Sequence, residues 1–222
     1  SISRFASLSR MMNHFFSHSL LGMVQNDYPD LYVVFSGGDD LFFIGPWDEV
    51  LRFSLKIRSS FGEFAADNPD LTLSAGIGVF NPPLPIRDLA RRTDTLLESS
   101  KHFRTDKGEK DAVTVFEDTV DWETYRRLLE IGEWLSEQVE AEQLNTAFLH
   151  RILHYGRQAR LVESGEVRAA IYRSHLSYDL ARNIEKKVRP EVYEKLNGWL
   201  ISDDFRQHSS IPLHYALYLN RT

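Results

Sequence analysis

The sequence predicts an α+β domain followed by an all-helical domain. Short apolar runs rich in β-branched and aromatic residues alternate with helical patterns as far as residue 118, whereas only helical patterns follow from residue 119. A length of 222 residues leaves room for two domains, and a composition of 42% hydrophobic and 26% charged residues is typical of a globular chain. We therefore expect one domain over residues 1–118 and a second over residues 119–222.

The first predicted elements are a helix and a hairpin. Apolar residues spaced by three and four predict a helix over residues 3–21, which the sequence Asn26-Asp27-Tyr28-Pro29-Asp30 ends. The apolar runs 31–35 and 41–44 predict two strands joined by a tight turn at Ser36-Gly37-Gly38-Asp39-Asp40. Because both runs are apolar throughout, we expect the hairpin to be buried on both faces.

The rest of the first domain is predicted as helix, strand, helix and strand on a mainly antiparallel sheet. A helix begins at Trp47-Asp48-Glu49, with acidic residues in its first turn, and keeps helical spacing to Phe64. A strand over 71–80, a helix over 86–100 and a strand over 112–116 follow. Gly76 and Gly78 inside the first of these strands indicate close approach of another backbone or a ligand. The second domain is predicted to form helices over 122–139, 144–162, 167–184, 191–200 and 210–219.

Composition excludes several classes of function. The absence of cysteine excludes disulfides, thiolate catalysis and cysteine-ligated metal sites. The net charge of −6 disfavours a protein that holds nucleic acid mainly by neutralising phosphates. No apolar run approaches the roughly 20 residues that span a bilayer, and no signal peptide is visible, so we expect a cytoplasmic protein.

The turn of the predicted hairpin carries the strongest chemical signal. Asp39 and Asp40 are adjacent carboxylates between two apolar strands, and burying like charges side by side is costly unless a cation compensates them. Mg²⁺ or Mn²⁺ is the natural cation, since these ions take one or two carboxylates together with substrate phosphates. Gly37 and Gly38 leave space for a phosphate or a base, and two such ions would support phosphoryl transfer. The alternative interpretation of the four residues is a plain β-turn.

The hairpin and its surroundings resemble one family. Residues 32–42 are similar to the cyclase-palm hairpin of the large subunit of type III CRISPR effector complexes, and Gly45-Pro46-Trp47-Asp48 follows as in the Csm (III-A) branch. The similarity covers most of residues 3–117, and it continues in three further segments: 4–10 with Phe15-Phe16, 73–77, and Lys101 with 108–116. The helical part fits the family's C-terminal domain in position and length.

The resemblance implies a ferredoxin-like palm domain that converts ATP into cyclic oligoadenylate second messengers when the complex binds target RNA, in antiviral defence. Asp39 and Asp40 would be catalytic and hold two Mg²⁺ or Mn²⁺ ions. The 3′-hydroxyl of one ATP would attack the α-phosphate of another, and pyrophosphate would leave. The nucleotide would lie against six residues: Ser36, Gly37, Gly38, Ser74, Lys101 and Lys110.

Two departures from the family pattern keep alternatives open. The family's palm begins with a strand that carries a metal-binding Asp before the first helix, and this strand is not in the sequence. The family's nuclease domain contains an adjacent His-Asp pair, which occurs nowhere here. The chain could therefore be a fragment of the large subunit, or the missing part could lie on another polypeptide. It could also be a structural module of the ribonucleoprotein whose palm is inert or incomplete. A diguanylate cyclase is a further alternative within the fold, although the turn is followed by Leu41, and the family's inhibitory Arg-x-x-Asp motif is absent at residues 28–31.

The helical domain mixes basic and aromatic residues, which is typical of a helical bundle surface or of a surface that binds RNA or protein. The resemblance implies contact with the other subunits of the effector complex, including its small helical subunits, and contact with guide and target RNA through the complex. The residues in question are Arg151, Tyr155, Arg157, Arg160, Tyr172, Arg173, Arg182, Lys186, Lys187 and Arg189. The pairs His14/His18 and His150/His154 have chelating spacing but no third ligand nearby, so we interpret them as ordinary histidines.

Overall fold

The computed structural model describes residues 2–38, 40–81, 83–105, 108–109 and 111–221. Contacts between residues divide the chain into two compact units. The first unit comprises residues 1–115 with 119–122, and the second comprises residues 116–118 with 123–222. No helix among the described residues is both long enough and apolar enough to cross a membrane.

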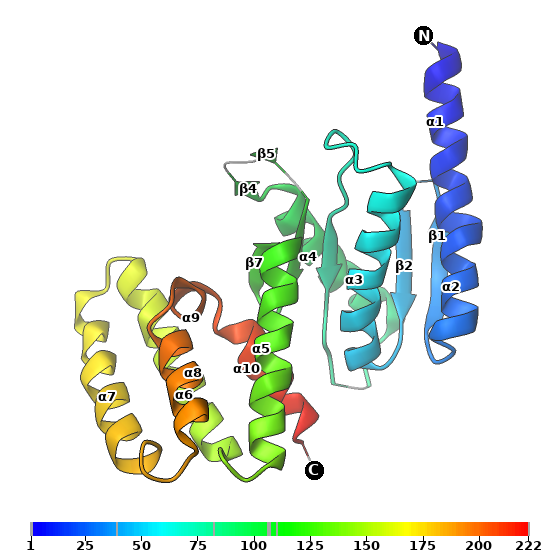
Figure 1. Cartoon of the computed structure of the whole chain (residues 1–222). Helices are drawn as coiled ribbons and strands as arrows, with labels where there is room; N and C mark the ends of the chain where they lie inside the picture. The colour runs from blue at the N-terminus through cyan, green and yellow to red at the C-terminus, as the bar shows by residue number, and fades with distance from the viewer. Residues whose placement is uncertain (1, 39, 82, 106–107, 110, 222) are drawn as a thin grey trace. The chain divides into compact units, whose positions relative to one another are not determined.

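The first unit opens with a helical segment that changes its hydrogen-bonding pattern part of the way along. The helix α1 (Ile2–His14) leads into a π-helical segment η1 (Phe15–Ser19) and then into α2 (Leu20–Asp27). Figure 1 shows these elements running together beside the hairpin. The helix therefore extends past the predicted end at residue 21, as far as the turn before Pro29.

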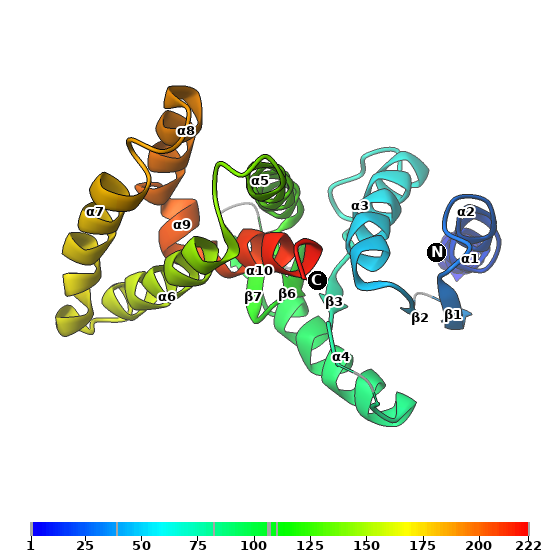
Figure 2. The same cartoon turned by 90° about the horizontal axis from the view of Figure 1, so that it is seen from below.

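The predicted hairpin is confirmed. Strand β1 (Tyr32–Gly37) pairs antiparallel with β2 (Asp40–Ile44), and α3 (Trp47–Phe64) follows. One face of the hairpin packs on a core formed with the helices, whose buried members are Phe15, Phe16, Leu20, Val24, Leu31, Phe53, Ile57 and Phe61. In Figure 2, α1, α2 and α3 lie on the same side of this hairpin.

The expectation that the hairpin is buried on both faces was wrong. Tyr32 is 68% exposed and Phe35 is 54% exposed, because the helices of the described chain cover only one face of the two strands. An apolar run along a strand shows that both faces are apolar, but it does not show what covers each of them.

The second sheet has the order β3-β6-β7, built from β3 (Ala75–Ile77), β6 (Ala112–Val115) and β7 (Asp118–Asp121). The predicted strand 71–80 is thus regular only at its centre. Strand β3 pairs parallel with β6, because the helix α4 (Ile86–Lys101) carries the chain back across the sheet, whereas β1 and β2 pair antiparallel. Two short paired strands, β4 (Arg104–Thr105) and β5 (Gly108–Glu109), lie between α4 and β6, where no strand was predicted.

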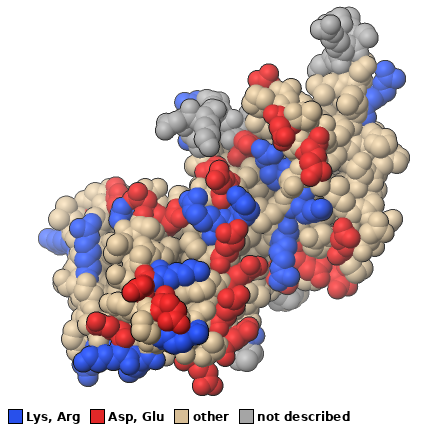
Figure 3. Space-filling model, in the orientation of Figure 1, with Lys and Arg blue, Asp and Glu red and all other residues tan. Residues whose placement is uncertain are grey.

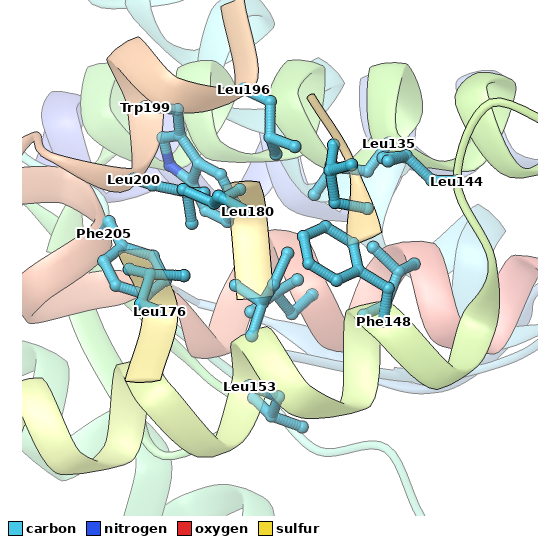
Figure 4. Packing of buried hydrophobic residues seen from close by; sticks show 14 of the residues in the cluster. Leu135, Leu144, Phe148, Leu153, Leu176, Leu180, Leu196, Trp199, Leu200 and Phe205 are labelled. Carbon is cyan, nitrogen blue, oxygen red and sulfur yellow. The ribbon is translucent and has the colours of Figure 1, made fainter. Parts of the chain in front are cut away.

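The second unit is helical, as predicted. Its elements are α5 (Trp122–Glu140), α6 (Thr146–Glu163), a 3₁₀ segment η2 (Val167–Ile171), α7 (Tyr172–Asn183), α8 (Pro190–Leu200), α9 (Asp203–His208) and α10 (Ser210–Leu219). Figure 4 shows Phe148, Leu180 and Leu196 among the apolar side chains that converge between these helices. The Asn145 side chain caps α6 by accepting a 2.8 Å hydrogen bond from the Phe148 amide.

Candidate nucleotide site

Strand register places Asp40 on the open face of the hairpin. Gly37 pairs with Asp40, and Phe35 pairs with Phe42. Directly opposed residues of antiparallel strands project to the same face, and alternate residues share a face. Asp40 therefore shares the uncovered face with Gly37 and the exposed Phe35, whereas its neighbour Leu41 packs against the helical core. The Asp40 carboxylate is exposed and accessible to a ligand.

The two glycines of the turn leave free space beside the backbone. Gly38 has φ of +67°, a left-handed conformation that glycine adopts without steric cost. A Cβ added to Gly38 would meet no atom of the described residues within 4 Å, and one added to Gly37 would meet only the Phe35 ring. The backbone of the turn is therefore open to close approach by a phosphate or a base. Asp39, the other predicted carboxylate, lies outside the described residues.

The pKa of Lys101, at the end of α4, responds to the charge of Asp40. Its ammonium group donates a 3.0 Å hydrogen bond to Glu98 Oε1, and that bond is the main reason why the pKa of Lys101 is raised. The charges of Glu98, Asp40 and Asp94 raise the pKa further. The fold thus brings two of the predicted site residues, 61 positions apart in the sequence, close enough for the charge of Asp40 to raise the pKa of Lys101.

The structure gives Ser36 a role within the fold. Its hydroxyl donates a 2.6 Å hydrogen bond to the carbonyl oxygen of Phe16. A hydroxyl has one proton, so with this bond in place Ser36 can only accept a hydrogen bond from a nucleotide. The sequence predicts Ser36 as a nucleotide contact, but it does not predict this hydrogen bond to the helix.

The other predicted contacts are less defined. Ser74 is half-buried and directly precedes β3, and no hydrogen bond among the described residues joins it to the hairpin. Lys110 lies outside the described residues.

Sequence patterns did not indicate that Asn13 belongs to this site. Its Oδ1 atom accepts a 3.1 Å hydrogen bond from the Gly38 amide. A helical asparagine has no distinguishing sequence signal, since the contact joins residues 25 positions apart.

The described residues supply some of the ligands that a divalent ion needs. Among the described residues, no three side chains of the His, Cys, Asp or Glu type gather into a metal-binding group. Mg²⁺ commonly takes only one or two carboxylates and completes its shell with phosphates and water. The exposed Asp40 carboxylate, beside a glycine turn with room for phosphate, is a ligand of this kind.

The basic residues predicted to form a binding surface on the helical unit are used partly within the fold. Arg151 Nε lies 2.7 Å from Asp179 Oδ2, and Arg160 Nη1 lies 2.7 Å from Asp118 Oδ1. Tyr172 is buried, whereas Tyr178 is 60% exposed. On the face drawn in Figure 3, acidic and basic side chains are interspersed over this unit. The surface therefore offers single exposed aromatic residues among charges of both signs.

A helix, a hairpin with an acidic glycine turn, and an α-helix crossing over to a parallel strand define a palm-type domain. The family model for the second palm domain of Cas10/Cmr2 matches residues 1–114. The chain belongs to this family, Cas10, the large subunit of type III CRISPR effector complexes, and its curated relatives are of subtype III-A.

Relatives and solved structures agree with this assignment. The chain is 31% identical over 192 residues to a protein of Enterococcus italicus named as the single-strand-specific deoxyribonuclease Cas10/Csm1 of subtype III-A. This match covers 83% of the chain but only 24% of that relative. The fold matches the Csm1–Csm4 cassette in complex with one ATP (TM-score 0.69, 20% identity, 100% of this chain and 33% of that one). It also matches the cassette in complex with cA4 (TM-score 0.68, 19% identity, 98% and 34%).

Proposed function

We propose that the first unit is the nucleotidyl-transfer palm of a type III-A effector complex and that it forms cyclic oligoadenylates from ATP. The observation that carries this proposal is the exposed Asp40 carboxylate, on the open face of the hairpin and next to a glycine turn with room for phosphate. Support comes from the similar Csm1 structures described with ATP and with cA4.

The residues of this site would have separate roles in the reaction. Asp39 and Asp40 would hold Mg²⁺ or Mn²⁺, which neutralises phosphate charge and favours ionisation of the attacking hydroxyl. The open backbone at Gly37 and Gly38 admits the triphosphate, and Lys101 contributes a positive charge toward it.

The reaction exchanges a phosphoanhydride bond of ATP for a phosphodiester bond. A bond forms between the 3′-oxygen of one nucleotide and the α-phosphorus of the next, and the bond from that phosphorus to pyrophosphate breaks. The hydroxyl proton passes to solvent. Ser36 would accept a hydrogen bond from the nucleotide, since its own proton is bound to Phe16. Ser74 and Lys110 remain proposed contacts of the same nucleotide.

The domain assignment is likewise a proposal, with a palm over 1–118 and a C-terminal helical domain over 119–222. Among the described residues, β2 pairs only with β1, and β3 pairs only with β6. Each of these strands therefore has an unpaired edge, and a further strand between them would join the two sheets. The Asp-bearing strand that the family resemblance places before the first helix suits this position.

We propose that the helical unit contacts other protein subunits of the complex, including small helical ones, and that guide and target RNA act through that assembly. Val167, Ile171 and Tyr178 are exposed by 80%, 62% and 60% along η2 and α7. Apolar and aromatic side chains among mixed charges are typical of protein interfaces, whereas RNA-binding surfaces are more uniformly basic. The related structures contain Csm1 together with Csm4.

The inert structural module remains the second candidate, because the described residues contain no group of three metal-ligating side chains. The deoxyribonuclease activity in the relatives' names is not assigned to this chain, since the sequence has no adjacent His-Asp pair. A diguanylate-type enzyme would use GTP in place of ATP.

Metal binding separates the enzyme from the inert module. We would measure the melting temperature of the complete large subunit with ATP, with and without Mn²⁺, for the wild type and for Asp39→Asn/Asp40→Asn. We expect Mn²⁺ to raise the melting temperature of the wild type and to have a much smaller effect on the variant. Equal shifts in both proteins would refute the metal-binding role of the aspartates.

A further inference from the structure

The turn of the hairpin is held by a side chain from the first helix. Asn13 lies in the last turn of α1, and its Oδ1 atom accepts the 3.1 Å hydrogen bond from the Gly38 amide. The same oxygen accepts a 3.3 Å hydrogen bond from the Ser17 hydroxyl, which restricts the rotation of the Asn13 side chain. The side chain is exposed and makes no contribution to the core.

A second hydrogen bond joins the same two elements. The Ser36 hydroxyl donates to the Phe16 carbonyl, in the segment where the helix changes from α to π geometry. Short π-helical turns of this kind occur frequently at functional sites. These two bonds thus hold the hairpin on both sides of its last residue pair, Gly37 with Asp40: one at Ser36, which pairs with Leu41, and one at Gly38 in the turn.

The helix that provides these bonds is itself rigidly packed. Phe15 and Phe16 are each only 2% exposed, and both rings contact Phe61 of α3. In contrast, Gly38 has open space where a side chain would stand and adopts a left-handed conformation. A turn with two glycines samples many conformations unless its backbone is held. The hydrogen bond from the Gly38 amide to Asn13 restricts the backbone of this turn.

We propose that Asn13 is a positioning residue for the metal–nucleotide site. It acts through the Gly38 amide to hold the turn, and with it Asp40, in the conformation that receives a divalent ion and a nucleoside triphosphate. This inference rests on the proposed function of the same turn. Asparagine is a poor helix former, so the helix alone gives no reason for this residue at position 13.

The test is a titration of Mn²⁺ together with AMPPNP into the complete large subunit assembled with its partner subunits and RNAs. Asn13→Ala removes the acceptor, Asn13→Asp keeps an oxygen in the same place, and His14→Ala is an exposed control on the same helical turn. One hydrogen bond of ordinary strength corresponds to roughly five- to tenfold weaker binding in Asn13→Ala. We expect Asn13→Asp to bind at least as tightly as the wild type and His14→Ala to match it.

The outcomes separate this inference from the proposed function. Asn13→Ala binding as tightly as His14→Ala would overturn the positioning role, and Asn13→Asp binding as weakly as Asn13→Ala would show that the acceptor oxygen is irrelevant. A wild type that binds Mn²⁺ and AMPPNP but makes no cyclic product from ATP would overturn the proposed function alone, since the titration still measures the effect of Asn13. A wild type that binds neither would overturn both.

Discussion

Gly76 of β3 lies so close to α4 that an added Cβ would stand 2.3 Å from the amide nitrogen of Leu97. The carbonyl of Thr93 and the carbonyl carbon of Leu96 would be within 2.7 and 2.8 Å. The sequence predicted close approach of a backbone or a ligand at this glycine, and the structure shows that it is the backbone of the helix that ends at Lys101. The absence of a side chain at Gly76 therefore sets how closely α4 approaches the sheet.

Gly76→Ala should destabilise the first unit by about 1–3 kcal/mol, because a helix backbone has to move to admit the methyl group. Gly22→Ala is the matched control. A Cβ there meets no described atom within 4 Å, and alanine is the better helix former by about 1 kcal/mol. Thermal unfolding of both variants checks this prediction. A Gly76→Ala protein that melts at or above the temperature of Gly22→Ala would contradict the close packing.

Ser100→Ala should also destabilise the first unit, by about 1–3 kcal/mol, because it leaves buried polar groups without a partner. The Ser100 hydroxyl is fully buried, donates to the Ala75 carbonyl at 2.6 Å and lies 2.7 Å from Thr114 Oγ1. Ser99→Ala on the exposed side of α4 is the control, since its hydroxyl bonds only the carbonyl one turn earlier among the described contacts. Urea unfolding of the two variants should separate them, and equal midpoints would argue against the buried network.

Ionisation of the Asp118 carboxyl should lower the free energy of unfolding of the second unit as the pH rises from 4 to 7. Burial raises the pKa of this carboxyl from 3.8 to about 6, in spite of Arg160 and Ser210, which lower it. Below pH 4 the group is neutral in both the folded and the unfolded chain. Between pH 4 and 6 the unfolded chain ionises first, so the stability that the neutral group provides is lost as the pH passes through the folded pKa. The loss amounts to about 3 kcal/mol at most.

The comparison with Asp118→Asn isolates this group. We expect the unfolding free energy of the wild type minus that of the variant to fall between pH 4 and pH 7, measured by urea unfolding with tryptophan fluorescence. A difference that rises with pH would mean that the ion pair with Arg160 outweighs burial, which contradicts the raised pKa.

Lys101→Met should raise the KM for ATP by roughly ten- to a hundredfold and change kcat less, if the ammonium binds the triphosphate, since a hydrogen bond to a charged group contributes about 1.5–3 kcal/mol. Lys101→Arg should retain much of the affinity. Arg91→Met, on the same helix and paired with Asp88, is the control. Initial rates at varied ATP concentration measure these constants. A Lys101→Met enzyme with an unchanged KM would remove this residue from the nucleotide site.

Sequence patterns predicted the helices and the hairpin well because their apolar periodicity reflects local geometry. They did not predict that Tyr32 and Phe35 remain exposed, because an apolar run carries no information about which face has a partner. They also missed the positive φ angles of Phe116 and Glu117 in the turn between β6 and β7, where neither residue is a glycine.

Sequence motifs predicted residues of the candidate site, but not the contacts that packing creates among them. The Gly-Gly-Asp-Asp sequence and the family resemblance pointed to the turn and to Lys101. The hydrogen bond from Gly38 to Asn13 and the bond from Ser36 to Phe16 depend on how the helix packs against the hairpin, so they become visible only in three dimensions.

The most direct test of the proposed chemistry is to resolve by mass the products that the complete large subunit makes from labelled ATP. The subunit would be assembled with guide and matching target RNA, and Mg²⁺ or Mn²⁺ would be supplied. We predict cyclic oligoadenylates from the wild type and none from Asp39→Ala/Asp40→Ala. Product from GTP but not from ATP would move the assignment to a diguanylate-type enzyme. No product from either nucleotide, in a complex that still binds target RNA, would contradict a catalytic role for this palm.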